Sequence, residues 1–294
     1  MKTLMAFDVG ATNTKWAVCT DEYTVLKQGS FRTPHTGADE LAGMLAATVK
    51  AEGGSCEGIC ISILGTVNKG VIENGGNLPF MTGFDLASSL SRSTGLCVGV
   101  ENDGKCNTLG ELAAGSLKGC RDRVSIVLGT GVGAGIIIDG RLYRGYGNNA
   151  GEIGYSYLHI DRAPQLEYVA GMRNSYMGLM DRVREVSDRD YSNTYEVFME
   201  ANNGDMKALE GIRNYSRELA GLIWNLHFTL DPERISIGGG ITAEELLCDM
   251  ITEETFRLCD SFPLPVKKPV IVFSKLGNTA NLFGAVRSYL DSEN

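Results

Sequence analysis

The feature that most constrains the fold is one local plan that occurs twice along the chain. In residues 4–20, "LMAFDVGATNTKWAVCT", apolar residues flank a Gly-Ala-Thr-Asn-Thr stretch, which predicts a strand, a tight turn and a second strand. Residues 124–143, "VSIVLGTGVGAGIIIDGRLY", repeat this order around a second Gly/Thr turn. Two halves of similar plan predict duplicated domains that face one another across a cleft, a common place for a ligand.

Helix and strand patterns alternate in the first half of the chain. Residues 38–54, "ADELAGMLAATVKAEGG", have helical spacing with a glycine stop, and residues 59–64, "ICISIL", are typical of a buried strand. A short helix at 85–95, a strand at 96–103 and a helix that begins at Asp103 or just after it follow. This alternation predicts an α/β fold with a mostly parallel sheet that carries helices.

The second half is expected to hold a helical insertion. Residues 165–230 are mainly helical, and near their end a 3.6-residue stripe typical of a core-facing side is formed by Leu219, Ile223, Leu226 and Leu230. Residues 234–256, "RISIGGGITAEELLCDMITEETF", predict a strand, a triple-glycine turn and a helix. We therefore predict a smaller domain of residues 1–118 plus 279–294 and a larger domain of residues 119–278.

Charge and composition exclude several classes of partner. A net charge of −9 with 27 basic residues argues against nucleic acid or an acidic membrane surface as the main partner. The start of the chain does not resemble a secretory signal, and no stretch approaches the ~18 apolar residues of a membrane span, so we expect a cytoplasmic protein. The eight cysteines are scattered without a C-x-x-C pair, which indicates reduced thiols and supports neither disulfides nor a zinc knuckle.

The second glycine turn matches a dinucleotide-binding fingerprint as a string. Gly129, Gly131 and Ala134 fit G-x-G-x-x-G/A, with Glu152 roughly 20 residues later. That fingerprint needs a helix directly after the glycines, whereas here they lead into "GIIIDGRLY", in which Asp-Gly is a hairpin signal. A nicotinamide oxidoreductase is therefore improbable. One such turn alone could be a plain tight hairpin, but two of them favour backbone N–H groups that hold a polyphosphate across the cleft.

The motifs resemble those of the ROK family of sugar kinases, within the actin, hexokinase and Hsp70 ATPase superfamily. "FDVGATNTK" and "LGTGVGAG" resemble its two phosphate loops, "SIGGGIT" its adenosine-side loop, and "ENDGKCNTLGE" its catalytic strand-to-helix junction. "GNLPF" and "YRGYGNNAGEIGY" resemble its sugar-binding segments. The resemblance implies two facing ribonuclease H-like domains of the actin-like ATPase class, with a nucleotide and sugar cleft between them. It also implies ATP and Mg²⁺ as cofactors, and a homodimer.

The resemblance also assigns roles to individual residues. Asp103 would be the general base that accepts the proton of a primary (6-) hydroxyl; from its position alone it could be an ordinary N-cap. Asp8 would hold Mg²⁺ through water, with an Asx-type turn as the alternative. The sugar would contact Asn77, Asn102, Asp103, Glu152 and Tyr155. The nucleotide would contact Gly10, Thr12, Lys15, Gly129, Thr130, Gly131, Gly133, Gly239 and Gly240. A solvated surface lysine is as plausible for Lys15.

Two departures from the family pattern bear on the substrate. Family members commonly have His where this chain has Tyr155, followed by a cysteine-rich zinc motif that is missing here, so we predict no structural zinc. For the Tyr155 side chain we favour packing over stacking on a sugar or an aglycone. Similar "GEFGY" strings without zinc occur in bacterial β-glucoside kinases, which favours a β-glucoside or an otherwise altered substrate, while glucose stays possible. The alternatives are an N-acetylmannosamine or fructose kinase, and a catalytically inactive sugar-sensing protein.

Overall fold

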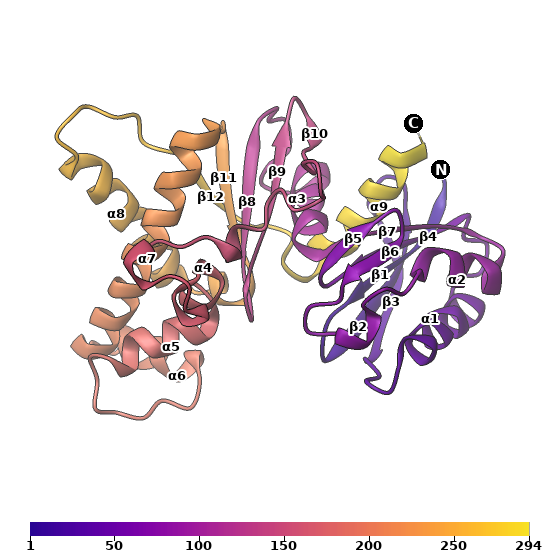
Figure 1. Cartoon of the computed structure of the whole chain (residues 1–294), viewed down its shortest axis with the longest axis horizontal. Coiled ribbons are helices and arrows are strands. Elements are labelled where there is room, and N and C mark those ends of the chain that lie inside the picture. The colour runs from indigo at the N-terminus through magenta and orange to yellow at the C-terminus, as the bar shows by residue number, and fades with distance from the viewer. Residues whose placement is uncertain (294) are drawn as a thin grey trace. The chain divides into compact units, whose positions relative to one another are not determined.

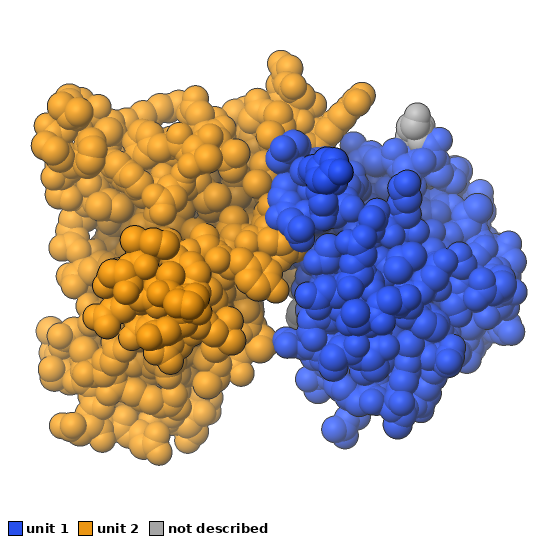
Figure 2. All heavy atoms as spheres, in the orientation of Figure 1, with its two compact units in different colours: residues 1–119, 142–150, 278–294 blue, residues 120–141, 151–277 orange. Residues whose placement is uncertain are grey.

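The structure is a computed structural model that describes residues 1–293, apart from the side chain of residue 278. Residue 294, with which the smaller predicted domain ends, lies outside the described residues. The chain divides into two compact units (Figure 2). Unit 1 comprises residues 1–119, 142–150 and 278–294, and unit 2 comprises residues 120–141 and 151–277. Segment 142–150 groups with unit 1 by its contacts, whereas the ranges expected from sequence place it in the larger domain.

Two five-stranded sheets form the centres of the units, with the same order of strand roles in each (Figure 1). The first sheet, in unit 1, has the order β3-β2-β1-β4-β7, and the second, in unit 2, has the order β10-β9-β8-β11-β12. Unit 1 also contains a small sheet of β5 and β6. The strands are β1 Thr3–Val9, β2 Asn13–Thr20, β3 Val25–Arg32, β4 Gly58–Ile63, β5 Thr66–Asn68, β6 Val71–Asn74, β7 Cys97–Asn102, β8 Arg123–Leu128, β9 Val132–Ile138, β10 Arg141–Leu142, β11 Arg234–Gly238 and β12 Ile271–Phe273. The predicted α/β class and the repeat of strand, turn and strand are confirmed.

The prediction of a mostly parallel sheet is wrong. β1 pairs with β2, and β2 with β3, in antiparallel register, while only β1–β4 and β4–β7 are parallel in the first sheet. β8 likewise pairs antiparallel with β9 and parallel with β11. The physical reason is that each Gly/Thr turn joins its two strands directly, and a short connection can only make an antiparallel pair.

Helices cover the sheets. The glycine stop expected for the first helix is present at Gly53, and Asp85 and Asn102 cap α2 and α3. They are α1 Ala38–Glu52, α2 Leu86–Thr94, α3 Asp103–Ala114, α4 Ala170–Arg173, α5 Tyr176–Arg184, α6 Thr194–Asn202, α7 Met206–Leu230, α8 Glu245–Ser261 and α9 Ala280–Glu293. In unit 1, α9 packs against β1, β4, β7 and α3, and Figure 1 shows α1 and α2 on the other face. In the part of the chain from 1 to 293, no helix has the length and apolar character needed to cross a membrane.

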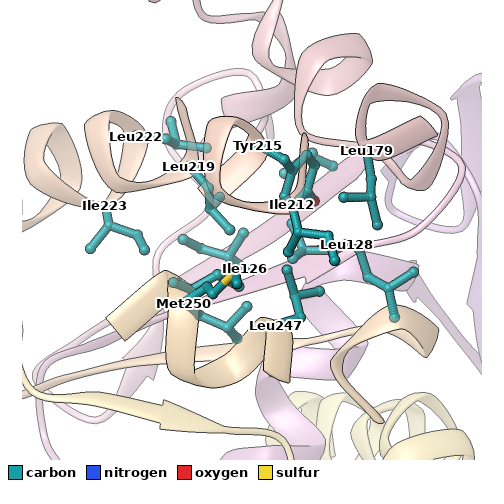
Figure 3. Close-up of a cluster of buried hydrophobic side chains, with 14 of the residues drawn as sticks. Ile126, Leu128, Leu179, Ile212, Tyr215, Leu219, Leu222, Ile223, Leu247 and Met250 are labelled. Atoms are coloured by element: carbon teal, nitrogen blue, oxygen red, sulfur yellow. The ribbon is translucent and has the colours of Figure 1, made fainter. Parts of the chain in front are cut away.

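Each unit has its own hydrophobic core. In unit 2, apolar side chains of β8 pack against α5, α7 and α8, as the labelled residues of Figure 3 show. Leu219 and Ile223 of α7 are fully buried and Leu226 is nearly so, which confirms the predicted core-facing stripe. Complete burial of one such side chain stabilises the fold by about 1.5–3 kcal/mol. The cores therefore fix the sheets whose strand ends and turns carry the predicted site residues.

Candidate active site

The strand-to-helix junction at Asn102 and Asp103 lies in unit 1, where β7 leads directly into α3. Asn102 is the N-cap: its Oδ1 accepts a hydrogen bond from the Lys105 N–H at 3.0 Å. The N-cap alternative for Asp103 is therefore wrong, since Asp103 is the first helical residue. Its Oδ1 accepts hydrogen bonds from Asn102 Nδ2 at 3.0 Å and from the Gly104 N–H at 2.9 Å. This position at a helix N-terminus favours a negatively charged carboxylate.

A glycine links this junction to the loop that carries Asn77. Asn102 Nδ2 also donates to the Gly65 carbonyl at 2.9 Å. Gly65 has a φ of +95°, and a Cβ atom there would lie 1.9 Å from the Asn74 carbonyl oxygen. Only glycine fits this close approach. The contact therefore brings the loop after β6, with the exposed Asn77, to the side of unit 1 that holds Asn102.

Asp8 lies in β1, within the five-stranded sheet of unit 1, and its environment differs from that of Asp103. Its Oδ1 accepts hydrogen bonds from Asn281 Nδ2 at 2.9 Å and Ser62 Oγ at 3.2 Å. Burial raises the pKa of Asp8, and the Asn281 hydrogen bond, the Lys15 charge and the Ser62 hydrogen bond oppose that shift only in part. Lys15 stands opposite Asp8 in the β1–β2 register. A buried carboxylate of this kind gains from a nearby cation.

The turn that follows Asp8 is braced by residues that the sequence did not point to. The Gly10 N–H donates to the Asn13 carbonyl at 3.2 Å. Thr33 donates from its hydroxyl to the Gly10 carbonyl at 2.8 Å and from its N–H to the Thr12 carbonyl at 3.0 Å. Thr33 directly follows the end of β3 and lies 23 residues after Gly10 in the sequence. No local pattern could therefore have identified it. The brace fixes the backbone of the predicted phosphate turn.

Asp8 suits a magnesium ion that is carried mainly by its nucleotide. Among the described residues, no group of three or more His, Cys, Asp or Glu side chains could hold a metal ion. Mg²⁺ in phosphoryl-transfer sites usually binds one or two carboxylates together with phosphate oxygens and water. Asp8 is a single buried carboxylate and fits that mode.

The second predicted phosphate turn lies in unit 2, between β8 and β9. The Gly129 N–H donates to the Gly131 carbonyl at 2.9 Å, and the Tyr176 N–H at the start of α5 donates to the Gly129 carbonyl at 3.0 Å. The strand β9 begins at Val132, so no helix follows the glycines. This confirms that the dinucleotide fingerprint is out of context, because the helix N-terminus that would hold a pyrophosphate is missing here.

A pocket of about 480 Å³ adjoins this turn within unit 2. It is lined by Leu128, Gly129, Thr130, Tyr176, Thr194, Tyr195, Phe198, Gly240, Ile241 and Glu244. Three predicted nucleotide residues thus meet in one pocket, while Gly131, Gly133 and Gly239 do not line it. Gly239 instead has a φ of +110°, and a Cβ atom would lie 2.0 Å from the Leu128 carbonyl oxygen. The aromatic lining was missed because it comes from α5 and α6, whose sequences carry no nucleotide motif.

Glu152 precedes a short 3-10 turn, Ile153–Tyr155, in unit 2, and Tyr155 is its last residue. A Cβ atom on Gly151 would lie 2.7 Å from the Ala134 carbonyl oxygen, so the turn presses against β9. Glu152 is partly buried. The Tyr155 side chain is 68% exposed, so the packing favoured from sequence is wrong. Ile153 of the same turn packs against the core of unit 2, whereas Tyr155 stays exposed.

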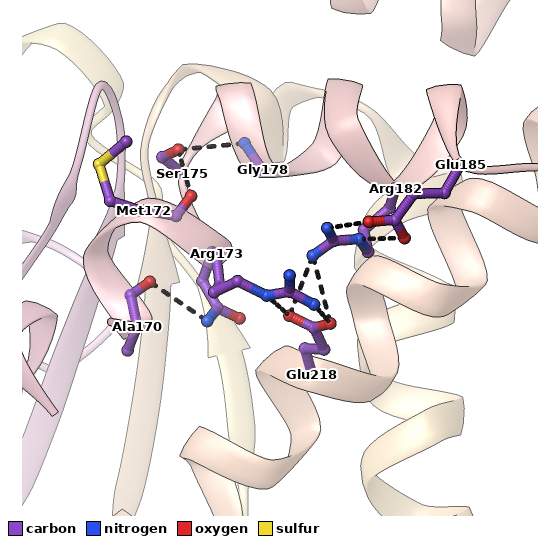
Figure 4. Close-up of polar contacts among 9 residues, drawn as sticks. Ala170, Met172, Arg173, Ser175, Gly178, Arg182, Glu185 and Glu218 are labelled. Carbon is purple, nitrogen blue, oxygen red and sulfur yellow. Dashed lines mark hydrogen bonds and ion pairs between the residues drawn. The ribbon is translucent and has the colours of Figure 1, made fainter. Parts of the chain in front are cut away.

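The helix α4 supports this turn from its other side. A Cβ atom on Gly171 would lie 3.0 Å from the Gly154 carbonyl oxygen, which indicates direct backbone packing. α4 is held in turn by Arg173, whose Nε donates to Glu218 at 2.8 Å; Glu218 also pairs with Arg182 (Figure 4). Because Glu218 belongs to α7, the longest helix of unit 2 anchors the segment that carries Glu152.

Comparison with known proteins gives a consistent result. The sequence model of the ROK family matches residues 4–291. A β-glucoside kinase of Listeria monocytogenes is 28% identical over 99% of this chain and 98% of its own length. The crystal structure of a ROK family protein from Streptococcus pneumoniae in complex with sucrose has a TM-score of 0.88 at 29% identity, with 99% of each chain covered. That of a ROK family glucokinase from Streptomyces griseus, in complex with glucose and AMPPNP, has a TM-score of 0.82 at 25% identity and covers 97% of this chain and 98% of that one.

Proposed function

This chain belongs to the ROK family of sugar kinases, and we propose that it transfers the γ-phosphoryl group of ATP to the primary (6-) hydroxyl of a hexose or β-glucoside, with Asp103 as the general base. The observation that carries the proposal is the fixed Asp103 carboxylate beside Asn102 at the start of α3. A held carboxylate next to an amide side chain is suited to bind a hydroxyl and to accept its proton as the phosphorus–oxygen bond forms.

The nucleotide half of the reaction is supported by the pocket of unit 2. The turn carries the Thr130 hydroxyl, a donor for phosphate oxygens, and the aromatic lining offers a surface for a base. Asp8 and Lys15 in unit 1 are proposed to act on the phosphate side. When bound, Mg²⁺ neutralises charge on the phosphates, and Asp8 would hold it through water.

Each unit carries polar groups that suit a sugar. Asn77, Asn102 and Glu152 supply amide and carboxylate oxygens of the kind that bind vicinal hydroxyls. The exposed ring of Tyr155 is available for stacking on a sugar or an aglycone, which favours a β-glucoside over a small free hexose. The β-glucoside kinase of Listeria monocytogenes supports the same choice at 28% identity.

A coupled ADP-release assay with ATP and Mg²⁺ tests the proposal. The panel consists of glucose, a β-glucoside such as cellobiose, N-acetylmannosamine and fructose. We expect sugar-dependent ADP release, fastest with glucose or the β-glucoside. Preference for N-acetylmannosamine or fructose would assign the alternative kinase activity. Sugar binding by calorimetry without ADP release for any sugar would instead favour the sugar-sensing alternative.

Two further properties follow from the resemblance and belong to the same proposal. We propose a cytoplasmic homodimer, which light scattering of the purified protein tests through its mass in solution. We also propose that the chain carries no structural zinc, since the segment from Tyr155 to Tyr168 contains no cysteine. Elemental analysis that finds stoichiometric zinc in protein purified without added metal would contradict the second point.

A further inference from the structure

Segment 142–150 belongs to unit 1 although the chain on both sides of it belongs to unit 2. Most of its residues are exposed, and it has no helix and only the end of β10 to order it. The Ala150 N–H donates to the Arg144 carbonyl at 3.1 Å, which closes the segment into a loop. An exposed loop of this kind keeps one conformation only if other contacts hold it.

The first such contact is an ion pair with the strand that ends at Asn102. Glu101 Oε2 accepts hydrogen bonds from Arg144 NH2 at 2.7 Å and Arg144 Nε at 3.2 Å. Glu101 Oε1 accepts from the Asn102 N–H at 2.9 Å. The Glu101 side chain is 7% exposed and that of Arg144 45%. A buried carboxylate without a charged partner is costly. The ion pair with Glu101 therefore stabilises the observed position of the Arg144 guanidinium.

The second contact comes from the first turn of α3. Lys105 is 1% exposed, and its Nζ donates to the Asn148 carbonyl oxygen. Its N–H donates to Asn102 Oδ1, the cap of the same helix. A buried ammonium group must find an acceptor, and here that acceptor is the main chain of segment 142–150. Glu101 and Lys105 therefore flank Asn102 and Asp103 in sequence, and each holds one point of the segment.

We propose that Glu101 and Lys105 are positioning residues that hold segment 142–150, through Arg144 and Asn148, in a fixed place beside Asn102 and Asp103. The purpose of this tether is to keep the acceptor hydroxyl of the sugar in line with the Asp103 carboxylate. This purpose rests on the proposed kinase function, whereas the tether itself rests on the contacts. Misplacement of reacting groups by ~1 Å can cost about 10²-fold in rate, so a loose segment should impair sugar use.

Arg144→Ala tests the tether, because Arg144 is half exposed and its removal leaves the fold's core intact. Arg141→Ala is the matched control: it removes an exposed cation three residues earlier that has no ion pair among the described contacts. Arg144→Lys keeps the charge but loses the paired N–H donors. Four quantities are measured for each variant: amide hydrogen exchange of segment 142–150, KM for the sugar, KM for ATP, and the melting temperature.

In Arg144→Ala we expect faster exchange in segment 142–150, a KM for the sugar raised about tenfold or more, and a KM for ATP within about twofold of wild type. Arg144→Lys should lie between, and Arg141→Ala should match wild type. Unchanged exchange in Arg144→Ala would overturn the tether. Equal losses for sugar and ATP, together with a lower melting temperature, would show a merely structural role and overturn its purpose. A wild-type protein without kinase activity on any sugar would refute the proposed function, while the exchange experiment would still decide the tether.

Discussion

At the scale of single residues, the two aspartates of unit 1 have environments suited to different tasks. Asp103 lies at a helix N-terminus, where two hydrogen-bond donors hold one oxygen of its carboxyl group in place. Asp8 lies within the sheet, where burial raises its pKa. The proposed roles of base for Asp103 and metal ligand for Asp8 match this difference in surroundings.

Replacing Asp103 by Asn should separate chemistry from binding. Asn keeps the shape of the side chain and an oxygen that can accept from Asn102 and Gly104, but it cannot accept a proton. We therefore expect turnover to fall at least ~10²-fold, while sugar affinity and melting temperature stay close to wild type. Steady-state kinetics and calorimetry measure both. Asp85→Asn is the matched control, because Asp85 caps α2 through the Ser88 N–H outside the site. Turnover of Asp103→Asn near that of wild type would remove Asp103 from the base role.

Replacing Asp8 by Asn should change the pH dependence of stability. A pKa raised by burial means that the folded chain binds the proton more tightly than the unfolded chain does. Stability from this group is therefore full below the ordinary carboxyl pKa of about 4 and is lost as the pH rises through the folded value. Without Mg²⁺ we expect wild type to lose free energy of unfolding relative to Asp8→Asn over the pH range above about 4, as the pH rises through the raised pKa of Asp8. Parallel urea-unfolding curves for the two proteins across this range would contradict the prediction.

At the scale of elements, the site depends on places where one backbone touches another. Gly65 contacts the loop after β6, Gly239 contacts the end of β8, and Gly171 contacts the 3-10 turn after Glu152. Each glycine allows a loop to approach within the distance that a Cβ atom would occupy. The loops that carry the predicted polar groups are therefore fixed by strands and helices rather than by their own sequence.

Gly65→Ala should disturb the loop that carries Asn77, a proposed sugar contact, more than the backbone strain at Gly65 alone predicts. The new Cβ would meet the Asn74 carbonyl, so the loop with Asn77 must move. Gly119→Ala is the matched control, because its φ of +84° imposes similar strain but no atom lies within 4 Å of its Cβ. We expect Gly119→Ala to cost about 1–2 kcal/mol and to leave KM unchanged. Gly65→Ala should lower the melting temperature further and raise KM for the sugar; equal behaviour of the two variants would contradict this.

At the scale of the whole molecule, the cysteines agree with a reduced interior. Cys97 is exposed, Cys248 is intermediate and the other six thiols are buried. Burial raises the pKa of Cys19 to about 12 and that of Cys248 to about 11, which suppresses the reactive thiolate. With Ellman's reagent at about pH 8, below the ordinary thiol pKa, we expect one fast thiol in the folded protein and all eight in urea. Cys97→Ser should remove the fast phase; several fast thiols in the folded wild type would contradict the described burial.

The sequence by itself determined the local elements and the class of the fold. Apolar runs on both sides of "DVGATNTK" and "LGTGVGAG" specify hairpins, and the periodic stripe of α7 specifies its buried face, because both depend on residues close together in the chain. The family motifs likewise located the junction at Asn102 and Asp103. The prediction of a mostly parallel sheet was wrong, because it followed from the alternation of helices and strands. The glycine turns join neighbouring strands directly and make them antiparallel.

Only the tertiary structure decided the surroundings of the site residues. Asn281 donates to Asp8 from 273 positions away, Tyr155 proved to be exposed, and the segment with Arg144 joined unit 1. Burial, hydrogen-bond partners and pKa shifts arise from atoms that packing brings together, and a local pattern holds no record of them. The sequence therefore indicated which residues could do the chemistry, while the packing of distant segments set the charge, exposure and fixation of each.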